Sequence, residues 1–306
     1  MVPALDEHEN LSALHAELCS NLTSFDWELI LVDDGSTDRT FDVICELAAR
    51  DPRVRGLKLS RNFGHQAALL AGLREARGAA VVSLDADLQH PPALVPELVE
   101  QWRGGASIVH TRREASDDAG WLKRRMSAWY YRLFSFLSGV PIQEGESDFR
   151  LLDRDVVDVV VAMQDARPFL RGLVHWVGYS QTVIPYQAAR RFAGSSKYGL
   201  VQMLRLGAAG VTSFSTIPLR LGIALGVVTS LGAFLELAYV VFITARGESV
   251  PGWASVIGLV ALLMGVNFIL LGFLGTYIGH VFERVQSHPA YLIERRTRKV
   301  RAADNA

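Results

Sequence analysis

The segment Val81-Val82-Ser83-Leu84-Asp85-Ala86-Asp87-Leu88-Gln89-His90-Pro91-Pro92 decides the fold class of this chain. The apolar run over residues 79–84 predicts a short buried strand, and two carboxylates one residue apart follow it directly. The Pro-Pro pair then excludes an immediate helix. Asp85 and Asp87 are therefore expected at the carboxyl end of a strand, which is the edge where open α/β sheets bind their ligands.

Carboxylates at positions i and i+2 can face one crevice. Hard oxygen ligands on a turn suit Mg²⁺ or Mn²⁺, which keeps most of its waters and takes further ligands from the phosphates of a substrate. Asp85 and Asp87 are thus predicted to hold a metal–diphosphate. On its own an Asp-x-Asp pair is more often an ordinary solvated turn, so the surrounding sequence has to decide.

Short apolar runs alternate with helical patterns through the first 200 residues. Strands are predicted over residues 27–32, 54–59 and 106–110. This alternation predicts an α/β fold with a mainly parallel sheet that helices cover on both faces. Neither a G-x-G-x-x-G nor a G-x-x-x-x-G-K-[ST] sequence occurs, so a dinucleotide-binding or phosphate-loop site has no support.

The run Asp33-Asp34-Gly35-Ser36-Thr37-Asp38 follows the first of these strands. Its carboxylates suit a ribose or a base edge, and the following helix amino terminus favours phosphate. Helix capping alone explains residues 36–38 equally well.

Composition narrows the class of partner. The chain has 306 residues with 31 basic and 32 acidic side chains, so charge gives no reason to expect nucleic acid.

Cys19 and Cys45 are too few for a disulfide framework and are read as reduced thiols in the cytosol. No secretory signal is apparent after Met1. A strand is expected before Pro3 and is missing, which indicates either a misassigned start or a sheet that lacks this strand.

Two apolar segments, residues 221–243 and 254–278, are each long enough to span a bilayer. The predicted organisation is a catalytic domain over residues 1–200, a juxtamembrane amphipathic segment over 201–220, a transmembrane hairpin over 221–282 and a basic tail over 283–306. Cationic residues precede the first apolar segment and follow the second. Both termini and the α/β domain are therefore expected in the cytoplasm, on an inner (cell) membrane.

The loop Arg190-Arg191-Phe192-Ala193-Gly194-Ser195-Ser196-Lys197-Tyr198 combines cations, hydroxyls and a flexible glycine. Such a loop can clamp phosphate oxygens, although in isolation a solvated loop is the commoner reading. Its position just before the hairpin makes a lipid phosphate a candidate ligand.

Several motifs agree in identity and order with one family. They are Val2-Pro3…Glu7, Val32-Asp33-Asp34-Gly35-Ser36-Thr37-Asp38, Asn62-x-Gly64-His65-Gln66, Asp85-Ala86-Asp87-Leu88-Gln89-x-Pro91-Pro92, Ser147-Asp148-Phe149-Arg150-Leu151-Leu152 and Arg191-x-x-Gly194-x-Ser196-Lys197-Tyr198. Together they resemble the polyprenyl-phosphate glycosyltransferases of glycosyltransferase family 2, inverting enzymes with a GT-A (Rossmann-like) fold that are related to dolichol-phosphate mannose synthase. The resemblance covers almost the whole chain. It departs at the start, where family members carry a complete first strand.

The resemblance implies roles for the matching positions. The catalytic positions are Asp148 and Asp87, and the metal ligands are Asp85 and Asp87. Nucleotide-sugar binding is implied for Pro3, Glu7, Asp33, Asp34, Asn62, Gln66, Asp85, Gln89 and Arg112. Lipid-phosphate binding is implied for Arg191, Ser196, Lys197 and Tyr198.

The implied reaction is inverting, metal-dependent transfer of a hexose from a nucleotide sugar to undecaprenyl phosphate, for cell-envelope glycosylation. The two-helix hairpin resembles that of bacterial glucosyl carriers and favours UDP-glucose as the donor. A homotetramer is plausible from related proteins.

Three alternatives remain open. The first is a GDP-mannose-dependent polyprenyl-phosphate mannose synthase. A second is a processive polysaccharide synthase, whose Q-x-x-R-W motif is matched here only by Gln202-x-x-Arg205-Leu206. The third is a non-catalytic, membrane-tethered protein that binds nucleotide sugars.

Overall fold

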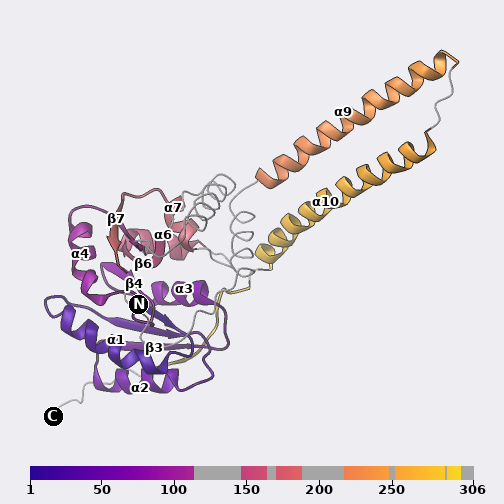
Figure 1. Cartoon of the computed structure of the whole chain (residues 1–306). Helices are drawn as coiled ribbons and strands as arrows, with labels where there is room; N and C mark the ends of the chain where they lie inside the picture. The colour runs from indigo at the N-terminus through magenta and orange to yellow at the C-terminus, as the bar shows by residue number, and fades with distance from the viewer. Residues whose placement is uncertain (114–145, 164–169, 188–216, 248–251, 287, 298–306) are drawn as a thin grey trace, which may run out of the picture. The chain divides into compact units, whose positions relative to one another are not determined.

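The computed structural model describes residues 1–113, 146–163, 170–187, 217–247, 252–286 and 288–297 (Figure 1). The chain divides into two compact units. Unit 1 comprises Met1–Ser135, Val140–Gln202 and His288–Ala306, and unit 2 comprises Phe136–Gly139 and Met203–Ser287. Each unit is described by itself.

Unit 1 is an α/β structure, as predicted, and its described strands form two four-stranded groups. One group has the order β1-β2-β3-β8 and the other the order β4-β6-β5-β7. The strands are β1 Val2–Ala4, β2 Leu29–Asp33, β3 Val54–Leu59, β4 Ala80–Ser83, β5 Ile108–Arg113, β6 Glu146–Asp153, β7 Gln181–Tyr186 and β8 Ile293–Arg296. Pairing is parallel for β1–β2, β2–β3 and β5–β7, and antiparallel for β3–β8, β4–β6 and β5–β6.

The amino-terminal residue joins the two groups of strands. The amino group of Met1 donates to the carbonyl of Val82 at 2.6 Å, and the Leu84 N–H donates to the Met1 carbonyl at 3.2 Å. β1 therefore lies between β2 and β4, and the strand order reverses at this point. In open α/β sheets such a reversal is where the ligand crevice forms.

The expectation of a missing first strand is wrong, because β1 is present, although it has only three residues. Its parallel pairing with β2 and the Met1 hydrogen bonds to β4 satisfy its backbone on both sides.

A cavity of about 530 Å³ lies near the beginning of β1, lined in part by Leu29, Ile30 and Val81. The opposite, carboxyl end of β1 leads directly to Glu7 and the ligand edge of the sheet.

Helices cover the strands of unit 1. They are α1 His8–Asn21, α2 Thr40–Arg50, α3 His65–Glu75, the 3₁₀ turn η1 Pro92–Leu94, α4 Val95–Arg103, α6 Arg154–Ala162 and α7 Leu170–Trp176. Leucines spaced three and four residues apart place one face of α1 in the core, which also takes side chains from α2, α4 and the strands. Since crossovers between parallel strands are right-handed, the reversal at β1 places α3 on the face opposite α1 and α2.

β8 was not predicted, because the sequence of residues 293–296, Ile-Glu-Arg-Arg, lacks the pattern of a buried strand. It pairs with the edge strand β3, with Leu57 opposite Arg296. Beyond β8, the hydroxyl oxygen of Thr297 accepts the N–H of Gly56, and the Thr297 N–H donates to the Gly56 carbonyl, each at 2.9 Å. A β-carbon at position 56 would collide with the side chains of Ile44 and Thr297, so only glycine fits there.

The described part of unit 2 consists of two long helices, α9 Ile217–Ala245 and α10 Trp253–Val285, which contact one another (Figure 1). Each contains a segment long and apolar enough to cross a membrane, Gly222–Ile243 in α9 and Leu262–Gly279 in α10. The first segment begins one residue after the start of the predicted 221–243, and the second begins eight residues after the start of the predicted 254–278. The predicted boundaries of the soluble and juxtamembrane segments stay predictions, since residues 201–216 lie outside the described ranges.

The pairing of β3 with the carboxyl-terminal segment can be tested at one side chain. The Thr297→Val variant keeps the shape of the residue and removes the acceptor for the Gly56 N–H. We expect it to lower the free energy of unfolding by about 1–2 kcal/mol, the cost of an unsatisfied buried donor. Thermal unfolding in detergent and hydrogen exchange of the Gly56 amide measure the effect. Thr297→Ser, which keeps the hydroxyl, is the matched control. Equal stability of the valine variant and the wild type would contradict the assignment.

Candidate active site at the end of strand β4

The turn after β4 is fixed by its own side chains. The Asp85 N–H donates to Nδ1 of His90 at 3.0 Å, and Oδ1 of Asp87 accepts the Gln89 N–H at 3.1 Å. Leu88 has a positive φ of 60°, which lets the chain reverse before the proline pair. The two carboxylates therefore start from a fixed backbone at the ligand edge of the sheet.

The donor set of this turn fits a divalent cation. Oδ1 of Asp85 is buried and has no hydrogen-bond partner among the described residues. The imidazole of His65 lies 3.6 Å from this oxygen, too far for a hydrogen bond. A buried carboxylate oxygen without a partner is costly unless a cation compensates it. With the second carboxylate at Asp87, these are the hard oxygen ligands that Mg²⁺ and Mn²⁺ prefer.

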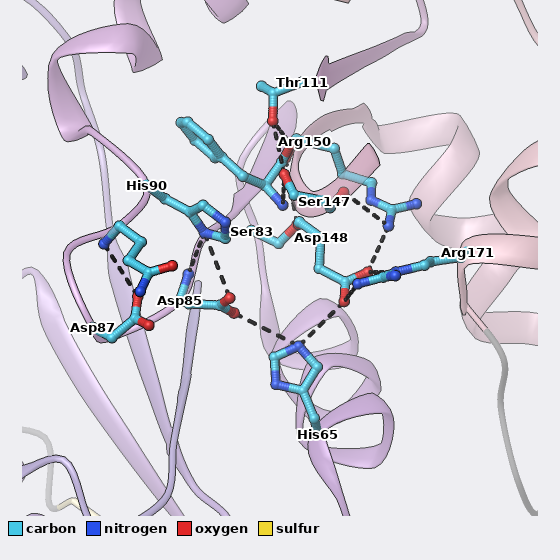
Figure 2. Close-up of polar contacts among 12 residues, drawn as sticks. His65, Ser83, Asp85, Asp87, His90, Thr111, Ser147, Asp148, Arg150 and Arg171 are labelled. Atoms are coloured by element: carbon cyan, nitrogen blue, oxygen red, sulfur yellow. Dashed lines mark hydrogen bonds and ion pairs between the residues drawn. The ribbon is translucent and has the colours of Figure 1, made fainter. Parts of the chain in front are cut away.

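A third carboxylate, that of Asp148 in β6, is buried beside the turn among two arginines and a histidine (Figure 2). Arg171 of α7 donates to Oδ1 at 3.0 Å and to Oδ2 at 2.8 Å. Arg150 of the same strand donates to Oδ1 at 2.6 Å. From α3, Nε2 of His65 lies 3.4 Å from Oδ2. Both oxygens of Asp148 are therefore already engaged by donors.

This environment sets the charge of Asp148. Burial opposes ionisation, but Arg171, His65 and Arg150 outweigh it and hold the pKa of the carboxyl well below its usual range. A carboxylate with such a low pKa is a weak base at neutral pH. The geometry therefore favours a positioning role for Asp148 over proton removal.

His65 lies between the two acidic groups. Nε2 approaches Oδ1 of Asp85 and Oδ2 of Asp148, as Figure 2 shows. Burial lowers its pKa, but the contact with Asp148 and the charge of Asp85 outweigh burial, so the pKa is raised overall. His65 links the turn that carries Asp85 to Asp148 electrostatically.

His90 supports the turn from the other side. Its ring stacks on Phe149, with centroids 5.1 Å apart. Burial lowers the pKa of His90, which favours a neutral ring whose Nδ1 can accept the backbone N–H of Asp85.

The acids that follow β2 hold the backbone of neighbouring loops. Oδ1 of Asp33 accepts the Ser36 N–H at 2.8 Å, and Oδ2 has no hydrogen-bond partner among the described residues. Asp34 accepts the N–H groups of Phe63 and Gly64 at 2.8 and 2.9 Å. Burial raises the pKa of Asp34, although both N–H groups oppose the shift. Direct nucleotide contact by either acid stays a prediction.

The other predicted residues lie around the same edge of the sheet. Pro3 is in β1 opposite Val32, and Glu7 follows that strand and accepts a hydrogen bond from Asn10 at 2.6 Å. Gln66 joins Asp148 to α7, because its Nε2 lies 3.4 Å from Oδ2 of Asp148 and its Oε1 accepts the Leu170 N–H at 3.0 Å. The remaining described positions are the exposed Asn62 after β3, Gln89 in the turn and the exposed Arg112 near the end of β5. The predicted lipid-phosphate residues Arg191, Ser196, Lys197 and Tyr198 lie outside the described residues.

Sequence reasoning gave no role to His65, His90, Arg150 or Arg171. His65 and Arg150 lie inside quoted motifs, so attention to the polar neighbours of Gln66 and Asp148 could have found them. Arg171 stands 23 positions after Asp148 and outside every motif considered. Only the packing of α7 beside β6 brings it to the site.

Several known proteins are similar in sequence to this chain. The model of glycosyl transferase family 2 matches residues 1–161. An uncharacterized glycosyltransferase of Bacillus subtilis (strain 168) is 37% identical, over 96% of this chain and 92% of that protein. A prophage bactoprenol glucosyl transferase homolog of Escherichia coli (strain K12) is 36% identical, over 96% of this chain and 97% of that protein. The bactoprenol glucosyl transferase of Shigella phage SfX is 36% identical, over 97% and 98%.

Solved structures are more distant. Glucosyl-3-phosphoglycerate synthase from Mycobacterium tuberculosis, in complex with Mn²⁺ and UDP-glucose, is 19% identical, with a TM-score of 0.46 over 69% of this chain and 75% of that one.

The charge cluster around Asp148 makes a prediction about stability. Asp148→Asn leaves the charge of the buried Arg150 uncompensated, which is expected to lower the free energy of unfolding by about 3 kcal/mol at neutral pH. Because the folded-state pKa is depressed, the contribution of the carboxylate is present above the unfolded value of about 3.9 and is lost as the pH falls through the folded value. Because Asp148 also raises the pKa of His65, the difference between variant and wild type should be largest between about pH 5 and 6.5, where His65 is protonated, and should shrink as the pH rises through the folded-state pKa of His65.

Unfolding in detergent at several pH values measures this difference. Asp158→Asn removes an exposed acid that pairs with Arg154 at 3.3 Å and is the matched control. It should change stability by less than about 0.5 kcal/mol. If Asp148→Asn were as stable as this control, the charge cluster around Asp148 would contribute nothing to the free energy of unfolding.

Proposed function

The chain belongs to glycosyl transferase family 2 and is a glycosyltransferase, as its motifs predicted, and from this premise we propose its reaction. It transfers a hexose, with inversion, from a nucleotide sugar to a polyprenyl phosphate. The favoured pair is UDP-glucose as donor and undecaprenyl phosphate as acceptor. Whole-length relatives that are named bactoprenol glucosyl transferases support this choice.

The observation that carries the proposal is the pair Asp85 and Asp87 at the reversal of strand order. Asp85 brings a buried oxygen without a hydrogen-bond partner among the described residues, and Asp87 brings a second carboxylate. These residues would hold Mg²⁺ or Mn²⁺. When bound, the metal stabilises negative charge on the leaving diphosphate.

The chemistry of the proposed acceptor makes a strong base at Asp148 unnecessary. An oxygen of the lipid phosphate forms a bond to the anomeric carbon while the bond from that carbon to the nucleoside diphosphate breaks. A single displacement of this kind inverts the anomeric configuration. The second pKa of a phosphomonoester is about 6, so the nucleophile is largely ionised at neutral pH and needs little general-base catalysis. Asp148 therefore orients an acceptor oxygen or a hydroxyl of the donor sugar.

Cations around the carboxyl edge receive the phosphate groups in this proposal. Arg112 is exposed near the end of β5. The loop with Arg191, Ser196, Lys197 and Tyr198 binds the lipid phosphate, as the family motif implies. Guanidinium groups suit this role because they bind phosphate oxygens in pairs.

The apolar helices give the reaction a location. We place α9 and α10 across the cell membrane with the catalytic unit and both termini in the cytoplasm, because cations flank the hairpin on its outer sides. A membrane-bound catalytic unit lies within reach of an acceptor whose phosphate is at the headgroup level. Assembly as a homotetramer belongs to the same proposal.

A transfer assay tests the reaction and names the sugar. Purified protein in detergent is incubated with undecaprenyl phosphate, Mg²⁺ and, in separate samples, radiolabelled UDP-glucose, UDP-galactose or GDP-mannose. We expect label to enter the lipid phase from UDP-glucose, and EDTA to abolish this transfer. Transfer from GDP-mannose alone would show that GDP-mannose, and not UDP-glucose, is the donor. Binding of nucleotide sugar without transfer from any donor would contradict the proposed reaction.

Two substitutions test the division of roles between the acids. Asp87→Ala should lower the transfer rate by about 10²–10³-fold, the scale expected when a main electrostatic contribution is removed. Asp148→Asn, compared per folded molecule, should lower it less, because Asp148 orients rather than accepts a proton. Asp158→Asn should match the wild type. A greater loss at Asp148 than at Asp87 would assign proton transfer to Asp148.

A further inference from the structure

A cluster of three different metal-ligating side chains lies away from β4, on α1 and at the end of α2. His15 and Cys19 are one helical turn apart on α1, and Asp51 follows the last residue of α2. Nε2 of His15 lies 3.0 Å from Oδ2 of Asp51. Sγ of Cys19 lies 3.5 Å from that nitrogen and 4.0 Å from that oxygen. All three atoms thus converge on one point.

These separations are close to those of a zinc site. In tetrahedral zinc sites the ligand bonds are about 2.0–2.3 Å long, which places ligand atoms about 3.3–3.8 Å from one another. The separation between Sγ and Nε2, 3.5 Å, lies in that range, whereas 3.0 Å between Nε2 and Oδ2 is shorter and 4.0 Å between Sγ and Oδ2 is longer, so binding requires shifts of a few tenths of an ångström. None of the three side chains is fully exposed. A set of imidazole, thiolate and carboxylate selects Zn²⁺ over Mg²⁺ or Ca²⁺, since thiolate is a soft ligand.

The neighbouring Arg53 fixes the carboxylate and competes with a metal. Its backbone N–H and its Nε each donate to Oδ1 of Asp51 at 2.9 Å, which orients Oδ2 toward His15. Its terminal nitrogen lies 2.7 Å from Oδ2 and 3.4 Å from Sγ of Cys19. The guanidinium also stacks on Trp27 at 4.2 Å. In the absence of a metal, the guanidinium of Arg53 balances the negative charge of Asp51.

We propose that His15, Cys19 and Asp51 form a binding site for a thiophilic divalent cation, Zn²⁺, with water at the fourth position. The guanidinium of Arg53, which is about half-exposed, turns aside when the metal enters, while its backbone N–H keeps Oδ1 in place. Loading the site ties α1 to the junction of α2 and β3. The site is separate from the residues that hold the nucleotide sugar and does not depend on the proposed reaction.

Titration of the metal-free full-length protein with Co²⁺ tests the site directly. A thiolate ligand gives a charge-transfer absorption band in the near ultraviolet, and tetrahedral coordination gives visible bands. We expect both in the wild type and in Cys45→Ser, which removes the exposed cysteine outside the cluster. Cys19→Ser should lose the charge-transfer band, and His15→Ala should weaken Co²⁺ binding at least tenfold. Zn²⁺ should displace the bound Co²⁺.

Arg53→Gln distinguishes a metal site from an ion-pair network. It removes a like charge beside the metal and keeps an amide donor for Asp51, so Co²⁺ should bind at least fivefold more tightly. A network that merely stabilises the fold would give no band in any variant. Absence of the band from the wild type, or its persistence in Cys19→Ser, would overturn the proposal.

Discussion

The ionised carboxylate of Asp148 is the constraint on which the candidate active site depends. It lies near the start of β6 and receives donors from Arg150 in the same strand, Arg171 in α7 and His65 in α3. Its carbonyl accepts the hydroxyl of Ser83, the last residue of β4. One residue thereby fixes two helices and the strand that precedes Asp85. Because each contact is charged or buried, the geometry of the turn after β4 and that of Asp148 depend on each other.

The same contacts that stabilise Asp148 decide what chemistry it can perform. Donors at both oxygens lower its pKa and make it a poor proton acceptor. An enzyme that had to activate a neutral hydroxyl would need a stronger base. A phosphate acceptor does not, because it already carries its negative charge. The burial and charge of the site are thus compatible with the proposed phosphate nucleophile. The relatives, one named a bactoprenol glucosyl transferase and one a homolog of such an enzyme, support the proposal that a lipid supplies it.

The sequence pattern predicted the strands and helices that are determined by neighbouring residues. The predicted strand over residues 54–59 is β3, and the apolar run before Asp85 is β4. The two apolar helices were found because length and composition alone define them. β8 escaped prediction because its residues pair with β3 across more than 230 positions of sequence. The part played by Arg171 was missed for the same reason, since only tertiary packing brings α7 to Asp148.

The position of the metal on the nucleotide is the most direct test of this account. Crystals grown with UDP and Mn²⁺, measured at a wavelength where manganese scatters anomalously, locate the ion independently of any assay. The account predicts one anomalous peak in contact with the carboxylates of Asp85 and Asp87 and with the diphosphate. Clear density for UDP with no anomalous peak at these carboxylates would contradict it.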